Sequence, residues 1–198
     1  MDLDLEIIIV DDGSPKPFLK PTLLPLEIHV LRLPFKTQPK NPCTPINYGV
    51  SRARGKYIAL SNPEILHSVP VLEEMRSLVV GNTYVTASAW CAEQQKWHAH
   101  STVNRHKESG GILPNGSQYH FMSMMTKELW DKAGGFDEDY RNGAGYDDPD
   151  FVMRLHRAGA VFAHRDDLVV EHPRRGAKSN FKRSDFEVNK QLFYSKWS

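Results

Sequence analysis

Cysteine and long apolar runs are the two things this sequence has least of. The only cysteines, Cys43 and Cys91, lie far apart and outside any C-x-x-C arrangement. This spacing argues against a dithiol redox motif or a zinc site, so we expect buried or free thiols, with one disulfide as the alternative. The first apolar run, Ile7 to Val10, follows acidic residues. It is too short for a signal peptide, and no run approaches the roughly 20 residues of a membrane helix.

A charge excess of either sign is also absent. The formal net charge of +1 gives no electrostatic case for a nucleic-acid partner. With 40% hydrophobic and 25% charged residues, the composition is that of a soluble globular protein, and 198 residues suffice for one domain with a substantial core. We therefore expect a cytoplasmic protein, either free or in peripheral contact with the inner membrane face.

What the sequence does have is a concentration of acidic residues around glycines. The stretch Gly134-Gly135-Phe136-Asp137-Glu138 is followed by Gly145-Tyr146-Asp147-Asp148-Pro149-Asp150. From Phe151 the pattern predicts a helix to Gly159, with Phe151, Leu155 and Ala158 on one apolar stripe. Carboxylates held at a helix start after a glycine-rich approach are well placed to supply a general base.

A structural role for the same residues is the alternative. Asp148 can be the N-cap of this helix, with Pro149 at the first helical position, where its missing N–H does no harm. The two interpretations are compatible, because a capped helix start also fixes the carboxylate in space.

The remaining periodicities predict alternating strands and helices. Strands are expected at 5–10, 27–33, 56–60, 83–91, 120–124, 161–163 and 168–171, and helices at 45–54, 69–80, 126–133, 151–159 and 182–197. The polar stretch 94–118 is predicted to be a loop on the acceptor side of a site. It includes His98 and His100, for which a surface strand or loop is a better interpretation than a metal site.

Several motifs, in order along the chain, resemble those of a known family. They are Glu6-Ile7-Ile8-Ile9-Val10-Asp11-Asp12-Gly13-Ser14, Asn47-Tyr48-Gly49, Ala53-Arg54-Gly55-Lys56-Tyr57-Ile58-Ala59-Leu60, and the acidic glycine region above. From Glu6 to His172 the chain resembles nucleotide-sugar-dependent glycosyltransferases of the GT-A fold, family 2. The acidic glycine region is also similar to the C-terminal motif of galactosyltransferases. The resemblance implies a single α/β domain over residues 1–198, with a mixed, mostly parallel sheet flanked by helices.

The chain departs from this family at two places. The family begins with a strand and a helix ahead of the strand that ends in Asp-Asp-Gly-Ser, whereas this sequence begins almost directly at the latter. Either the sequence is truncated at its N-terminus or the nucleotide pocket is built differently. Where the family has its D-x-D metal motif, this chain has Asn62-Pro63-Glu64. Glutamate is still a hard oxygen ligand, so a divalent metal remains feasible.

The resemblance implies a role for each matching residue. Asp148 is expected to be the catalytic base, with Asp147 second. Glu64 and His172 are expected to bind Mn²⁺ or Mg²⁺. His67 is a weaker candidate for binding the metal or a phosphate. A purely structural role is the alternative for all three residues.

A second group of residues is expected around the substrates. Asp11, Asp12, Asn47 and Asn62 match the nucleotide-sugar site, although the two aspartates can also be turn formers. Gly135 and Asp137 are expected to shape the loop or bind the acceptor. A basic run could close over the diphosphate or form a solvated face: Arg174, Arg175, Lys178, Lys182 and Arg183.

These roles predict inverting, metal-dependent transfer of a sugar from a nucleotide-diphosphate sugar to a glycan or lipid-linked acceptor, in surface polysaccharide synthesis. The alternative is a non-catalytic relative that binds carbohydrate or another protein, favoured by the missing first strand and the altered D-x-D. A nucleotidyltransferase ranks last, because no glycine-rich phosphate loop is found near the N-terminus.

Overall fold

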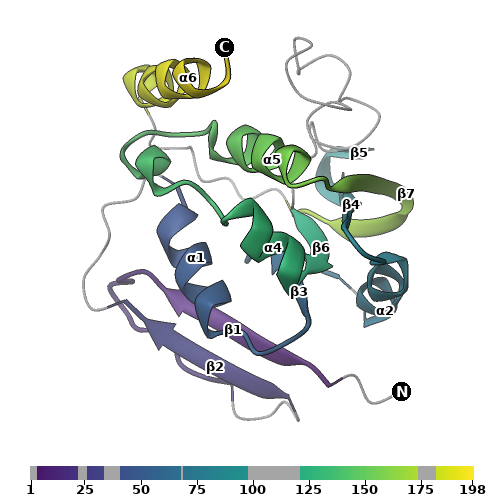
Figure 1. The fold of residues 1–198 in the computed structure, drawn as a ribbon. Coiled ribbons are helices and arrows are strands. Elements are labelled where there is room, and N and C mark those ends of the chain that lie inside the picture. Colours follow the sequence, from purple (N-terminus) through teal and green to yellow (C-terminus); the bar gives the residue numbers. More distant parts are fainter. Residues whose placement is uncertain (1–3, 22–25, 34–40, 68, 98–120, 174–181) are drawn as a thin grey trace. The chain divides into compact units, whose positions relative to one another are not determined.

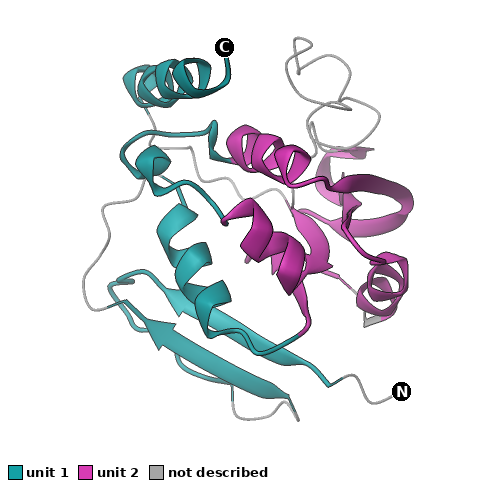
Figure 2. Cartoon of the chain, viewed as in Figure 1, with its two compact units in different colours: residues 1–55, 135–147, 181–198 teal, residues 56–134, 148–180 magenta. Residues whose placement is uncertain are grey.

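The computed structural model describes residues 4–21, 26–33, 41–67, 69–97, 121–173 and 182–198. The chain forms two compact units, coloured separately in Figure 2. Unit 1 comprises residues 1–55, 135–147 and 181–198, and unit 2 comprises residues 56–134 and 148–180. The single domain expected from the chain length stays a prediction.

Unit 1 is built on two parallel strands, β1 (Glu6–Asp11) and β2 (Glu27–Arg32), both close to their predicted positions. Helix α1 (Cys43–Arg52) packs against β1 (Figure 1). The approach is close at Gly49, where an added Cβ would lie 3.0 Å from Cγ2 of Val10. A side chain at this position would require the Val10 methyl group to move by a few tenths of an ångström.

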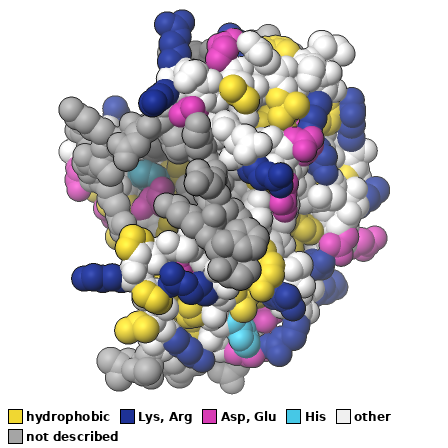
Figure 3. All heavy atoms as spheres, turned by 90° about the vertical axis from the view of Figure 1, so that its left-hand side faces the viewer, with side chains coloured by type: hydrophobic (Ala, Val, Ile, Leu, Met, Phe, Trp, Pro, Cys, Tyr) yellow, Lys and Arg dark blue, Asp and Glu magenta, His cyan; other side chains and the backbone are white. Residues whose placement is uncertain are grey.

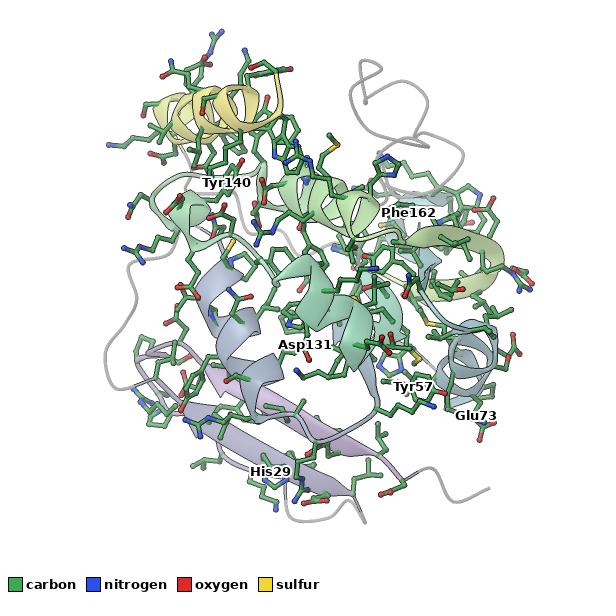
Figure 4. All side chains as sticks on the ribbon, viewed as in Figure 1. His29, Tyr57, Glu73, Asp131, Tyr140 and Phe162 are labelled. Atoms are coloured by element: carbon green, nitrogen blue, oxygen red, sulfur yellow. The ribbon has the colours of Figure 1, made fainter. Side chains whose placement is uncertain are left out.

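Unit 1 also contains the short 3-10 helix η2 (Glu138–Asn142) and the C-terminal helix α6 (Arg183–Trp197), which contact each other. Figure 4 labels Tyr140, which lies on η2 below α6. Tyr140 is fully buried, and the ammonium of Lys196 lies 5.2 Å from the centre of its ring. The face of α6 that is buried carries Asp185, Asn189 and Phe193, spaced one helical turn apart.

Unit 2 contains a five-stranded mixed sheet. Its members are β3 (Tyr57–Ser61), β4 (Thr83–Cys91), β5 (Lys96–Trp97), β6 (Met122–Thr126) and β7 (Val161–Glu171). The strand order is β3-β6-β4-β5, and β7 pairs with β4. The β4–β7 pair is parallel, whereas β6 is antiparallel to both neighbours. The expected mixed α/β fold is therefore present, with more antiparallel pairing than a mostly parallel sheet has.

The helices described in unit 2 are α2 (Val69–Leu78), α4 (Lys127–Ala133) and α5 (Asp147–Arg157), and the first residue of α5 lies in unit 1. Helix α4 begins and ends as predicted, with Thr126 accepting a hydrogen bond from the Leu129 N–H and Gly134 in the left-handed region at φ 78°. One apolar cluster fills the space between sheet and helices: Ile65, Val71, Met75, Val79, Val85, Ala87, Ala89, Met122, Met124, Leu168 and Val170.

Strand β7 carries an irregularity held by a buried polar network. Its register against β4 shifts between Ala87 and Ser88. His164 of β7 makes hydrogen bonds on both ring nitrogens, at 2.6 Å to Thr86 Oγ1 and 3.0 Å to Ser88 Oγ. Ser88 also donates to Asp166 at 2.6 Å. Because the network is on both sides of the shift, it fixes where β7 resumes pairing, and so where its last residues lie.

Two predicted boundaries need correction. Residues 161–163 and 168–171 were expected as two strands, but the network at His164 carries the pairing across the gap and they form one strand. Helix α5 begins at Asp147, so Asp148 lies within the first turn and is not the N-cap. Pro149 is tolerated there because the first four N–H groups of a helix have no intrahelical partner. The stripe of Phe151, Leu155 and Ala158 is buried as predicted.

Cys43 and Cys91 form no disulfide and are both buried, in agreement with the expectation of buried thiols. No helix within the described ranges is long and apolar enough to cross a bilayer. On the face drawn in Figure 3, lysine and arginine side chains are interspersed with acidic ones, consistent with the net charge of +1.

Replacing Leu155 by alanine should destabilise the protein by about 2–5 kcal/mol, because Leu155 is fully buried and the vacated space cannot collapse completely. The matched control is Leu19→Ala, at a leucine that is 82% exposed, which should change stability by less than about 0.5 kcal/mol. Urea unfolding followed by tryptophan fluorescence measures both. Equal midpoints for the two variants would contradict the assignment of Leu155 to the core.

Candidate functional site

The clearest constellation in unit 2 is a carboxylate and an imidazole that are distant in sequence. Nε2 of His172 lies 3.4 Å from Oε1 of Glu64. The side chains are 18% and 28% exposed respectively, so both are accessible to a ligand while being held by their surroundings. The Phe121 ring packs edge-on against the His172 ring at 5.1 Å between centroids, which restricts the imidazole to one orientation.

Backbone hydrogen bonds bring these two side chains together. The turn after β3 is tied to the end of β7 by reciprocal bonds, from Leu66 N–H to Glu171 O and from Glu171 N–H to Leu66 O, both at 2.9 Å. The His172 N–H then donates to Trp90 O at 2.8 Å. Glu64 is two residues before Leu66, and His172 directly follows Glu171. Their proximity therefore follows from strand pairing and not from the side chains alone.

The donor set fits a hard divalent cation. Two ligands at right angles around a cation of the size of Mg²⁺ are about 3 Å apart, close to the observed separation. No group of three or more His, Cys, Asp or Glu side chains that could hold a metal ion occurs among the described residues. The described pair alone leaves coordination positions for water and substrate oxygens, which Mg²⁺ commonly retains. Asn62, the third predicted residue here, is half-buried, and its N–H donates to Phe121 O at 2.9 Å.

The acidic pair lies at the start of α5. Asp147 is 6% exposed and Asp148 is half-buried. Behind them Asp150 is almost fully buried, with Oδ2 at 4.0 Å from Nε of Arg154. The Tyr84 hydroxyl is close enough to feel the Asp148 charge; burial raises the pKa of this phenol far above its usual range, and Asp148 adds to the effect.

Asp11 is engaged at the end of β1. Its Oδ1 accepts from the Ser14 N–H at 2.8 Å, and its Oδ2 accepts from the Phe18 N–H at 3.1 Å and from Nη1 of Arg32 at 3.0 Å. The Ser14 N–H is the largest influence and lowers the pKa of Asp11; burial opposes it, and Phe18 and Arg32 add to the lowering. Asp11 therefore organises the turn, as one interpretation of the sequence expected, while nucleotide contact by Asp11 and by the half-buried Asp12 stays a prediction.

The lowered pKa of Asp11 predicts an acid-dependent loss of stability. A carboxyl whose pKa is lower in the folded state stabilises the fold above its ordinary pKa of 3.8, and this contribution disappears as the pH falls through the folded value. Asp11→Asn should therefore lower the urea midpoint at pH 6, with a difference from wild type that shrinks below about pH 4. Asp4→Asn, at an exposed position, is the control. A difference independent of pH would rule out this origin.

Asn47 is bound to the glycine-rich segment of unit 1. Its Nδ2 donates to Phe136 O at 2.8 Å and to Glu138 Oε1 at 3.0 Å, and its Oδ1 accepts from the Phe136 N–H at 2.9 Å. Gly135 just before takes φ 66°, which favours glycine. Asp137 accepts from the Asp139 N–H at 3.0 Å and from Lys196 at 2.7 Å. Gly135 and Asp137 therefore shape the loop, and Asn47 holds it; a nucleotide role for Asn47 stays a prediction.

The structure thus brings together Glu64 with His172 in unit 2, and Asn47 with residues 135–138 in unit 1. His67 is exposed. Several predicted features lie outside the described residues: most of the 94–118 loop with His98 and His100, and the basic residues Arg174, Arg175 and Lys178. Sequence reasoning missed Lys196 and Asn189, whose contacts span long stretches of chain; only their helical spacing from Phe193 could have drawn attention to them.

No protein-family model matches the chain, and no curated protein matches it in sequence. Solved structures do match. Residues 1–349 of TarS from S. aureus superpose with a TM-score of 0.65 at 13% identity, over 96% of this chain. GalNAc-T7 with UDP, GalNAc and Mn²⁺ gives 0.61 at 13% identity over 96% of the chain. The mannosyltransferase PcManGT from Pyrobaculum calidifontis, with GDP-Man and Mn²⁺, gives 0.56 at 17% identity over 86% of the chain.

These neighbours are glycosyltransferases of the GT-A type, and the expected fold is thereby confirmed. Identities this low show the fold and not the substrates. The chain spans 55% of the TarS structure, 41% of GalNAc-T7 and 49% of PcManGT, so it corresponds to about half of each.

Proposed function

We propose that this chain, which has the fold of nucleotide-sugar glycosyltransferases, catalyses a metal-dependent sugar transfer. The sugar passes from a nucleotide-diphosphate sugar to a hydroxyl of a glycan or lipid-linked acceptor. The observation that carries this proposal is the Glu64–His172 pair, two metal-compatible side chains held 3.4 Å apart by backbone pairing. The proposal extends to a family 2 enzyme with inversion at the anomeric carbon, acting in surface polysaccharide synthesis in the cytoplasm at the inner membrane face.

In this proposal the chain's own residues have separate tasks. Glu64 and His172 hold Mn²⁺ or Mg²⁺, which when bound offsets negative charge on the departing diphosphate. Asp148 accepts the proton of the acceptor hydroxyl while the hydroxyl oxygen forms a bond to the anomeric carbon. At the same time the bond from the anomeric carbon to the diphosphate breaks, and its electron pair leaves with the nucleotide diphosphate. Asp147 is the second candidate for the base.

Other residues are assigned to substrate binding. Asp11, Asp12 and Asn47 in unit 1 and Asn62 in unit 2 are each proposed to bind the nucleotide sugar. The loop at Gly135 and Asp137 is proposed to face the acceptor. The ligands of the neighbours, UDP and GalNAc in one and GDP-Man in another, support a nucleotide-sugar donor without selecting its base or sugar.

Calorimetric titration with UDP, GDP and dTDP, each with and without Mn²⁺, tests the proposal. A functional donor site should bind at least one nucleotide more tightly when Mn²⁺ is present, and the corresponding nucleotide sugars should then be screened with glycan acceptors. If none of the three binds under either condition, the chain is no transferase on its own, and the non-catalytic carbohydrate-binding alternative takes its place.

A further inference from the structure

The acidic pair at the start of α5 follows a turn with an unusual backbone. Gly145 and Tyr146 both lie in the left-handed region, at φ 66° and 63°. For a bulky residue such as tyrosine this conformation is strained and persists only when its surroundings enforce it. Asp147 comes next in the chain, so whatever enforces the turn also sets the direction in which the acids are presented.

Helix α6 supplies the contacts that enforce it. The Asp185 O accepts from the Ala144 N–H at 3.0 Å, one turn before Asn189. One turn after Asn189, the Phe193 ring packs on the Tyr146 ring at 5.6 Å between centroids. Asp185, Asn189 and Phe193, on the buried face of α6, therefore each contact residues 140–146.

Asn189 is the centre of this arrangement. It is fully buried, and its Nδ2 donates to two carbonyls of the turn, Gly145 O at 2.7 Å and Tyr140 O at 3.0 Å. Its Oδ1 has no hydrogen-bond partner among the described residues. The two donated hydrogen bonds therefore tie Tyr140 and Gly145, five residues apart, to helix α6.

Gly143 shows how closely the turn is fitted around this side chain. An added Cβ at Gly143 would lie 2.1 Å from Asn189 Oδ1 and 2.8 Å from Asp185 O. Neither approach is tolerated by real side chains, so the chain passes Asn189 at a distance that only glycine permits. The turn and the amide therefore constrain each other.

We infer that Asn189 is a positioning residue for the acidic pair: by holding both ends of the 140–145 turn it fixes the backbone that presents Asp147 and Asp148. This inference rests on the proposed function for its catalytic consequence. Its structural part, the holding of the turn, does not depend on any activity.

The primary variant is Asn189→Asp, which keeps the shape but replaces the donating amide by a carboxylate facing two carbonyls. Asn189→Ala provides a second variant if the first does not fold. Lys190→Ala is the matched control, because Lys190 is the next residue on the same helix and is exposed. In the control, amide hydrogen exchange at residues 144–148 should equal that of wild type.

Amide hydrogen exchange is the first measurement, since it requires no substrate. Both Asn189 variants should exchange faster than the control at residues 144–148 while exchange in β4 stays unchanged. The second measurement is steady-state transfer, in which kcat should fall about 10–100-fold while the donor KM changes less than about twofold. A purely structural role would lower the fraction of folded protein without producing this split.

The outcomes separate the positioning role of Asn189 from the proposed sugar transfer. Unchanged exchange at residues 144–148 overturns the positioning role whatever the activity. Faster exchange with unaltered kcat shows that the turn does not present the reacting acid, which also overturns it. If wild type binds no nucleotide and transfers nothing, the proposed function fails, while faster exchange in the variants still supports the holding of the turn.

Discussion

Asp148→Asn is expected to lower kcat for sugar transfer by about 10²–10⁴-fold, because an amide cannot take up the acceptor proton. The fold should be retained, since asparagine has nearly the same size and shape as aspartate and Asp148 is only half-buried. Nucleotide binding should also be retained, because deprotonation of the acceptor is separate from donor binding. Initial rates with saturating donor, together with calorimetry, measure the two effects independently.

Two further variants make this result specific. Asp131→Asn is the matched control, because Asp131 is exposed on α4 and forms only a surface ion pair with Lys127. It should leave kcat unchanged. Asp147→Asn is the competitor: if it lowers kcat more than Asp148→Asn does, the base is Asp147 and the assignment is reversed.

Glu64→Gln is expected to abolish the gain in nucleotide affinity that Mn²⁺ confers, a loss on the order of 100-fold or about 2.7 kcal/mol. Glutamine keeps the size of the side chain but lacks the negative charge that a hard cation requires. The measurement is the ratio of nucleotide dissociation constants with and without Mn²⁺, which in the variant should approach one.

The control for this prediction is Glu128→Gln, the same chemical change at an exposed residue in the first turn of α4. Its Mn²⁺ dependence should equal that of wild type. A Glu64→Gln protein with an intact Mn²⁺ effect would show that the cation binds elsewhere, and the Glu64–His172 contact would then be a structural ion pair only.

Local patterns predicted most elements of the fold because each depends on neighbouring residues. The apolar stripe of α5, the glycine end of α4 and the strand 83–91 are all encoded within a few residues of where they occur. The continuous β7 was missed since its middle is held by His164 reaching across to β4. Side chains from another strand decide such a feature, and no window along one segment contains them.

The residues of the candidate site were likewise predictable only where a local motif includes them. Glu64 and His172 were predicted as metal ligands from motif resemblance, and the structure does place them together. Asn189 could not be predicted, because in the sequence it is an ordinary polar residue on a polar helix. Its significance arises only from the turn, far back along the chain, that folds against it.

The parallel pair of β1 and β2 has a consequence for handling the protein. Among the described residues β1 pairs with β2 alone, so each strand keeps one edge without a described ladder partner. The run from Ile7 to Val10 has the composition that promotes self-association into fibres when it is exposed. Glu6 and Asp11 bracket this run with negative charge and act as gatekeepers against such assembly. Neutralising either one should therefore increase precipitation on concentration, and at Asp11 the loss of stability described above adds to this effect.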